Sequence, residues 1–148
     1  MPAVSALTAI YVGPGEWANA VIRRWQRSPA SHCEMVTRRA GDLFECWSAS
    51  KMDGGVRRKA MLLKPAHWEL YRLPFKAEPV ATWFHAHEGR AYDLLGLLGF
   101  AWRPWRGERN KWFCSEACAA SVGMPEPWRF DPATWREMAR AIGKRVPL

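Results

Sequence analysis

The sequence is most informative at KWFCSEACAA, residues 111–120, where an aromatic run meets a cysteine. Small and helix-tolerant residues follow Cys114, with neither glycine nor proline before Gly123. This pattern predicts a helix that begins at or near Cys114. The dipole of a helix favours the thiolate form of a cysteine at its N-terminus. Cys114 is therefore the strongest candidate for a nucleophile.

A thiolate nucleophile needs a base, and SHCEMV at residues 31–36 supplies one in His32. The segment alternates as a strand does, which places the base on a strand and the nucleophile at the start of a helix. On that strand His32 and Glu34 share one face. Because side chains on one face of a strand point in parallel directions, we interpret Glu34 as a solvent-exposed neighbour of His32.

A second predicted strand, LFECWS at residues 43–48, follows a short turn and would pair antiparallel with the first. Alternation places Ser48 on one of its faces and Glu45 on the other. Whichever face meets His32 decides which of the two side chains orients the ring. From the residues alone, Ser48, Glu45 and Glu34 are all candidates for this role.

Four segments are informative together: the Ser-His strand at 31–36, Ser48-Ala49 followed by DGGVR at 53–57, the Tyr92-Asp93 pair, and FCSE at 113–116. In this order they resemble the circularly permuted branch of the NlpC/P60 papain-like cysteine hydrolases. The resemblance implies an α+β fold in which a small antiparallel sheet packs against helices, among them the cysteine-bearing helix. It also implies that Cys114 is the nucleophile and His32 its base.

Members of that family commonly carry a glutamate directly before an alanine on the strand after the histidine strand, and this chain has Ser48 there. The resemblance therefore implies that Ser48 is the third catalytic residue, beside Cys114 and His32. A carboxylate stabilises the imidazolium that forms during attack better than a hydroxyl does. We expect modest activity from a site that uses a serine.

The composition suits one domain, residues 1–148, that buries a core without disulfides or metals. Lys and Arg number 22 against 14 Asp and Glu, a net charge of +8. This charge favours an anionic partner such as cell wall, nucleic acid or acidic lipid headgroups. Because the basic residues are dispersed along the chain, we expect a generally basic surface and no specific nucleic acid partner.

The cysteines and histidines predict neither a metal site nor a cofactor. The four cysteines form no CxxC pair of the kind typical of structural zinc. His85 and His87 lie in a predicted helix, where positions two apart differ by about 200° around the axis. A signal peptide requires a basic residue near its start, and no basic residue precedes Arg23. No apolar run reaches the roughly 18–20 residues of a membrane span. We expect a cytoplasmically made protein with reduced thiols and no transmembrane segment.

Periodicity and turn residues predict the remaining elements. Strands are expected at 6–12, 56–63 and 68–73, with Pro74 ending the last, and helices at 16–26, from 80 to about 88, at 90–100 and after Asp131. The resemblance implies that the apolar run at residues 94–100 lies against the cysteine-bearing helix.

A loop with interleaved aromatic and basic residues, AWRPWRGERN at 101–110, leads into the predicted nucleophile. Indole rings and guanidinium groups can hold sugars, acyl chains or bases by stacking. We interpret Trp105, Trp112 and Tyr92 as substrate-binding residues. The alternatives are aromatic packing beneath the loop and, for Tyr92, an ordinary buried tyrosine.

Together these patterns predict a cysteine amidase, peptidase or acyltransferase that works through an acyl-enzyme. The resemblance implies peptide amides of peptidoglycan as one substrate class and lipid acyl groups as another. Access to a cell wall would require lysis, injection or a carrier such as a phage particle. Two other classes stay open: an inactive papain-like module that binds a cell-envelope or phage structural partner, and a small basic nucleic-acid binder, for which charge is the only argument. The sequence leaves the oligomeric state open.

Overall fold

In the residues that the computed structural model describes, 4–15, 17–93 and 111–148, an antiparallel sheet organises the fold. Its strands are β1 (Ser5–Tyr11), β2 (His32–Ala40), β3 (Leu43–Ser50), β4 (Gly55–Leu62), β5 (Trp68–Lys76) and β6 (Lys144–Val146). The helices are α1 (Trp17–Gln26), α2 (Ala77–His87), α4 (Cys114–Ser121) and α5 (Pro132–Ile142), with a 3-10 turn at Pro127–Arg129. The strands pair in the spatial order β4-β3-β2-β1-β5-β6. The predicted α+β class with an antiparallel sheet is confirmed.

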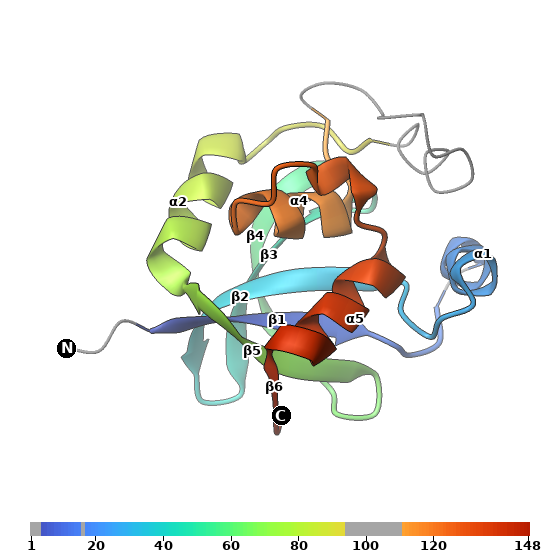
Figure 1. The fold of residues 1–148 in the computed structure, drawn as a ribbon, viewed down its shortest axis with the longest axis horizontal. Coiled ribbons are helices and arrows are strands. Elements are labelled where there is room, and N and C mark those ends of the chain that lie inside the picture. The colour runs from blue at the N-terminus through green and yellow to red at the C-terminus, as the bar shows by residue number, and fades with distance from the viewer. Residues whose placement is uncertain (1–3, 16, 94–110) are drawn as a thin grey trace.

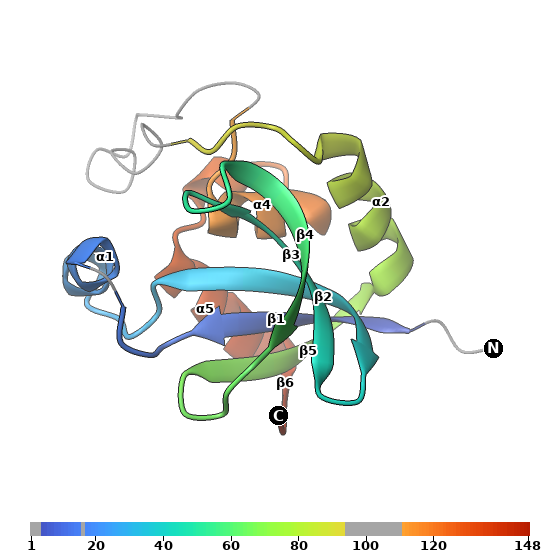
Figure 2. The same cartoon turned by 180° about the vertical axis from the view of Figure 1, so that it is seen from behind.

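Helices α2, α4 and α5 lie together over one face of the sheet, while α1 stands apart from them at one side (Figure 1). Seen from behind, β3 and β4 curve away from the direction of β1 and β2, so the sheet curls (Figure 2). Helix α4 contacts both β2 and β3, and α5 contacts β5 and β1. The helix that carries Cys114 thus lies against the strand that carries His32.

Strand alternation sorts the buried side chains into two clusters. Cys33 and Met35 of β2 join the larger core beneath the helices, whereas Val36 joins a smaller cluster on the opposite face. The large aromatic side chains of the larger core are Trp47, Phe84, Phe113 and Trp135. Consecutive residues of β2 therefore have different surroundings, and Glu34 shares the face of Val36.

The start of β4 sets the path of the chain after α2. Gly55 has a φ of +144°, which residues with a side chain rarely adopt, and a Cβ there would lie 2.0 Å from the carbonyl oxygen of Arg90. The backbone N–H of Val56 donates to the same oxygen at 2.8 Å. Because Gly55 has no side chain, the segment that follows α2 can run directly along the sheet edge.

Two prolines that the sequence treats as stops lie inside elements. Pro74 is within β5, where the pairing with β1 changes register between Ser5 and Leu7, so its missing N–H falls in an already irregular part of the ladder. Pro79 lies in the first turn of α2, where N–H groups have no partner within the helix. The predictions that a strand ends at Pro74 and that a helix begins at 80 are wrong for these reasons.

The strands expected at 6–12 and 56–63 and the helix expected at 16–26 correspond to β1, β4 and α1. Asp131 caps α5 as predicted, since its carboxylate accepts from the backbone N–H of Thr134 at 2.7 Å. Residues 94–100 of the helix expected at 90–100 lie outside the described residues, and so does the loop at 101–110. None of the helices within the described ranges has the length and apolarity that a bilayer-spanning helix requires.

Candidate active site

Cys114 is the first residue of α4, as the sequence predicts. Phe113 before it is extended, with φ −93° and ψ 158°, and its backbone N–H donates to the carboxylate of Glu116 at 3.3 Å. Glu116 thereby closes the first turn as the acidic member of a capping box does. The Cys114 thiol consequently lies at the positive end of the helix dipole.

His32 is the first residue of β2, and its ring interacts electrostatically with the Cys114 thiol. The structure therefore brings together the two residues predicted as base and nucleophile, although they are far apart in sequence. The side chain of His32 is 24% exposed, whereas Cys114 is only 1% exposed. Solvent thus reaches the pair from the histidine side.

The surroundings of the pair favour the charged form of both groups. Burial would lower the pKa of His32, but the negative charge and hydrogen bond of Cys114, together with Glu34, raise it to about 10. Burial would raise the pKa of Cys114, but a hydrogen bond with Cys33 and the positive charge of His32 hold it well below the ordinary thiol value. A thiolate beside an imidazolium is therefore the stable state between these two pKa values.

A carboxylate holds the other nitrogen of the ring. Glu34 Oε1 lies 2.7 Å from His32 Nε2. Glu34 accepts two further hydrogen bonds from the Arg57 guanidinium, at 2.7 and 2.6 Å. Arg57 Nε in turn donates to Asp53 at 2.8 Å. The charges therefore alternate in sign from the Cys114 thiolate through His32, Glu34 and Arg57 to Asp53.

The prediction that Glu34 is solvent-exposed is wrong, because its side chain is fully buried. Residues two apart on one face of a strand are separated by about 7 Å, a gap that a glutamate leaning toward a histidine ring can close. A buried carboxylate must be matched by charge and hydrogen bonds, and Arg57 supplies both. Burial would raise the pKa of Glu34, but the hydrogen bonds from Arg57 and His32 lower it below its ordinary value.

Ser48, which the resemblance predicts to orient the His32 ring, has a different partner. Its hydroxyl donates to the backbone carbonyl of Cys33 at 2.7 Å, and the residue is fully buried. Ser48 thus holds the backbone of β2 to β3. The prediction that Ser48 contacts the His32 ring is wrong, and Glu34 contacts the ring instead.

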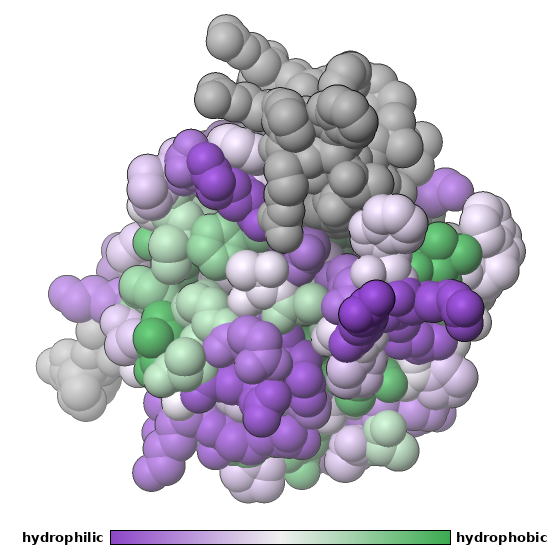
Figure 3. Space-filling model, turned by 45° about the vertical axis from the view of Figure 1, so that its right-hand side comes forward, coloured by the Kyte–Doolittle hydropathy of each residue, from purple (hydrophilic) through white to green (hydrophobic). Residues whose placement is uncertain are grey.

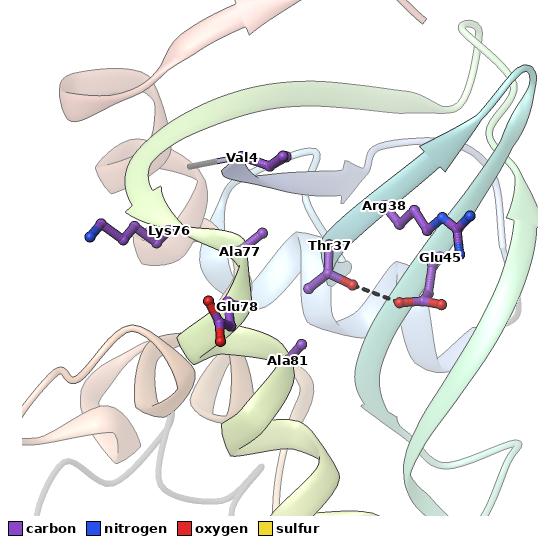
Figure 4. A pocket seen from close by; sticks show the side chains of 8 residues that line it. All are labelled: Val4, Thr37, Arg38, Glu45, Lys76, Ala77, Glu78 and Ala81. Carbon is purple, nitrogen blue, oxygen red and sulfur yellow. Dashed lines mark hydrogen bonds between the residues drawn. The ribbon is translucent and has the colours of Figure 1, made fainter. Parts of the chain in front are cut away.

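The third candidate, Glu45, belongs to the opposite end of β2. Its carboxylate accepts a hydrogen bond from Thr37 at 2.9 Å (Figure 4). Both residues line an open pocket between the β2–β3 hairpin and the start of α2, together with Val4, Arg38, Lys76, Ala77, Glu78 and Ala81. Glu45 is therefore engaged away from His32, and Glu34 is the carboxylate of the site.

Three of the four cysteines meet beside His32. Cys33 on β2 and Cys118 on α4 both interact with the Cys114 thiol. All four cysteines are free and buried. Burial raises the pKa of Cys33, Cys46 and Cys118, whereas the pKa of Cys114 is lowered. Cys114 is thus the thiol that the site activates.

Two of the three predicted substrate-binding residues lie beside α4. The Tyr92 ring packs on Phe113, with centroids 5.5 Å apart, and burial together with the charge of Cys114 raises the pKa of Tyr92. Trp112 pairs with Tyr92 through a backbone bridge and packs edge-on against an indole of α2. Trp105 lies outside the described residues. Substrate binding by these side chains stays a prediction.

Comparison with known families finds no family model that matches this chain, and a search of the curated proteins finds no match. What the site can do therefore follows from its own groups. A thiolate at a helix N-terminus, an imidazolium in contact with it and a carboxylate behind the ring can attack a carbonyl carbon and protonate the group that leaves.

Sequence reasoning missed the role of Arg57 and Cys33 in this arrangement. The basic cluster at 57–59 is typical of a solvated strand end, and Cys33 of a packing residue. A signal for the role of Arg57 was present in the sequence, because Asp53 lies four residues before it across a glycine turn. At this spacing Asp53 can pair with the Arg57 guanidinium and hold it near the sheet. Its pairing with Glu34 follows only once β3 is known to lie between β2 and β4.

Proposed function

We propose that this protein is a cysteine-dependent amidase or peptidase with a permuted NlpC/P60-like, papain-like fold that acts through an acyl-enzyme. The observation that carries the proposal is the row of Cys114, His32 and Glu34, in which His32 interacts with the Cys114 thiol and is hydrogen-bonded to Glu34. It supplies a nucleophile, a general base and the carboxylate that orients the base.

In the first half-reaction the Cys114 thiolate attacks the carbonyl carbon of an amide. The carbonyl oxygen takes up negative charge, and backbone N–H groups at the start of α4, that of Cys114 among them, donate to it. The C–N bond then breaks as the His32 imidazolium gives its proton to the departing amine. A thioester on Cys114 and a neutral His32 remain.

In the second half-reaction His32 takes a proton from water, and the water oxygen attacks the thioester carbonyl. The intermediate collapses to a carboxylic acid and the Cys114 thiolate, with His32 protonated again. Glu34 stabilises the imidazolium, and the two hydrogen bonds from Arg57 keep Glu34 ionised. An amine or alcohol in place of water would make the same site an acyltransferase.

The proposed substrate class is a peptide amide, with peptidoglycan peptides first and lipid acyl groups second. The net charge of +8 favours approach to an anionic polymer such as the cell wall. Tyr92 and Trp112 lie near the nucleophile, where their rings can pack on the acyl portion. For a wall substrate, delivery with a phage particle is the proposed setting.

The burial of Cys114 favours a second candidate function. A thiol that is 1% exposed is a poor target for a large substrate unless neighbouring groups move. The second candidate is a catalytically inactive module that binds a cell-envelope or phage structural partner without turning it over.

A short pulse of iodoacetamide at neutral pH, mapped by mass spectrometry, tests the activated thiol. We expect Cys114 to be alkylated at least about tenfold faster than the other cysteines. Incubation with purified peptidoglycan should release peptides, and Cys114→Ala should abolish the release. Cys46→Ala is the matched control, since Cys46 lies in the cluster on the opposite face. Equal labelling of all four cysteines without peptide release would favour the binding module.

A further inference from the structure

Helix α1 is attached to the rest of the molecule along one face. Ile22 is partly buried and packs against the larger core. Gln26 accepts a hydrogen bond from the backbone N–H of Ala133 at 2.7 Å, and Arg23 donates to the carbonyl oxygen of Gly13. These contacts fix which side of α1 faces outward.

The outward side of α1 carries a line of apolar side chains. Trp17, Val21 and Trp25 are 77%, 55% and 63% exposed. Residues four apart on a helix are rotated by only about 40°, so the three form one continuous stripe along it. The other exposed large hydrophobic residues of the described chain are scattered over different elements: Val4, Leu43, Met52, Leu62 and Ile142.

Cationic side chains border this stripe. Arg24 follows Trp17 by seven residues, nearly two full turns, so it lies about 20° from the indole around the helix. Arg24 and Arg27 are both exposed, and with Val21 and Trp25 they line a shallow surface hollow. Figure 3 brings this side of the molecule forward, and strongly hydrophilic side chains lie there beside pale and hydrophobic ones.

This combination fits the surface of an anionic lipid bilayer. Indole rings are favoured at the level of the lipid headgroups, because they are apolar with one polar N–H. Arginines beside them can contact lipid phosphates, and basic side chains near an anionic surface each add to binding. The net charge of +8 has the sign that such a surface attracts.

We propose that α1 is an interfacial helix that docks this protein on anionic lipid bilayers. Trp17, Val21 and Trp25 enter the headgroup region, while Arg24 and Arg27 contact the phosphates. The helix lies in the plane of the surface, since its opposite face is held by the protein. This docking does not depend on the proposed hydrolase chemistry.

Co-sedimentation of the full chain with vesicles tests the proposal. One set contains phosphatidylcholine alone, and the other contains phosphatidylcholine mixed with phosphatidylglycerol. We expect binding to the mixed vesicles only, and weaker binding as salt is raised. Arg24→Ala combined with Arg27→Ala should weaken binding roughly 25-fold, about fivefold for each arginine. Trp17→Ser combined with Trp25→Ser should reduce it at least about tenfold.

The matched control is Leu43→Ser combined with Leu62→Ser, a pair of exposed apolar residues that face each other across β3 and β4. This variant and Cys114→Ala should bind like the wild type. Three results would overturn the proposal: no binding to mixed vesicles, full binding by the Trp17 and Trp25 variant, or equal loss in the Leu43 and Leu62 control. Self-association through the stripe in the absence of vesicles, seen by sedimentation velocity, would also overturn it.

Discussion

Three consecutive residues of β2 act on the same ring and thiol. The His32 ring interacts with the Cys114 thiol, and Cys33, at the neighbouring position, also lowers the pKa of that thiol. Glu34, one residue further, returns to the His32 ring. The thiolate is therefore stabilised by the charge of one neighbour and by the hydrogen bond of another, and each effect can be removed separately.

Glu34→Gln keeps the shape of the side chain and removes its charge. The imidazolium then loses its partner, so the thiolate is less stabilised. We expect the apparent pKa of Cys114, measured from the pH dependence of its alkylation, to rise by about one unit. Glu45→Gln should leave it unchanged, because Glu45 pairs with Thr37.

Ser48→Ala distinguishes support of the backbone from orientation of the ring. Loss of its hydrogen bond to the Cys33 carbonyl should lower the free energy of unfolding by about 1 kcal/mol, measured in urea. The pH profile of Cys114 alkylation should stay that of the wild type. A shifted profile in Ser48→Ala with an unchanged one in Glu34→Gln would restore the original assignment of Ser48.

His32→Ala removes the positive charge beside the thiol. Alkylation of Cys114 in the wild type should be nearly independent of pH between the two pKa values of the pair. In the variant it should rise about tenfold per pH unit through the neutral range, as for an ordinary thiol. Wild-type turnover should fall as the pH rises through about 10, where His32 loses the proton it must donate. His85→Ala is the control, because His85 is exposed, and it should keep the wild-type profile. An unchanged profile in His32→Ala would contradict the pairing of His32 with Cys114.

At the scale of elements, the sequence predicted what local patterns determine. The start of α4 at Cys114 follows from the residues after it, and the β2–β3 hairpin from alternation around Gly41. The surroundings of Glu34 depend on residues distant in sequence, because Arg57, the cation that pairs with it, lies on β4 beyond the intervening strand β3. Its burial could therefore not be predicted from the periodicity of β2 alone. Pro74 and Pro79 were misjudged for the same reason, since sheet pairing and position within the helix decide whether a missing N–H costs stability.

Gly55→Ala tests the approach of the chain after α2 to β4. The new Cβ would lie 2.0 Å from a backbone oxygen, that of Arg90, which cannot move without its neighbours. We expect the free energy of unfolding to fall by about 2–4 kcal/mol. Gly54→Ala is the matched control, because Gly54 also has a positive φ, +80°, but has nothing within 4 Å. It should cost about 1 kcal/mol, and equal costs in urea unfolding would contradict the importance of the close approach.

At the scale of the whole molecule, two carboxylates tie separate parts of the fold together. Glu34 accepts from Arg57 across the sheet, and Glu69 of β5 accepts from Arg136 of α5 at 2.8 and 2.9 Å. The hydrogen bonds from Arg136 outweigh burial and lower the pKa of Glu69 to about 2. Both carboxylates are therefore better stabilised as anions in the folded protein than in the unfolded chain.

This difference predicts acid sensitivity. A group whose pKa is lower in the folded state stabilises the fold above its unfolded pKa, and this contribution is lost as the pH falls through the folded value. For Glu69 the loss runs from about 4.5 down to about 2. Glu69→Gln should lower the free energy of unfolding at neutral pH by about 2 kcal/mol and flatten its fall in acid. Glu78→Gln, at an exposed position, should have neither effect, and an unchanged acid profile in Glu69→Gln would contradict the role of this ion pair.

Strand β2 is hydrogen-bonded on both sides, with Ile10 opposite Cys33 and Trp47 opposite Met35. Inserting or deleting one residue within it would exchange the faces of every position beyond the change. A carboxylate would then lie under the helices and a thiol against a guanidinium. Over evolutionary time, changes in length should therefore accumulate in turns such as the one at Gly41. They should be purged from residues 32–36 of β2, which precede the irregular pairing with β3 between Val36 and Arg38, whichever substrate its descendants acquire.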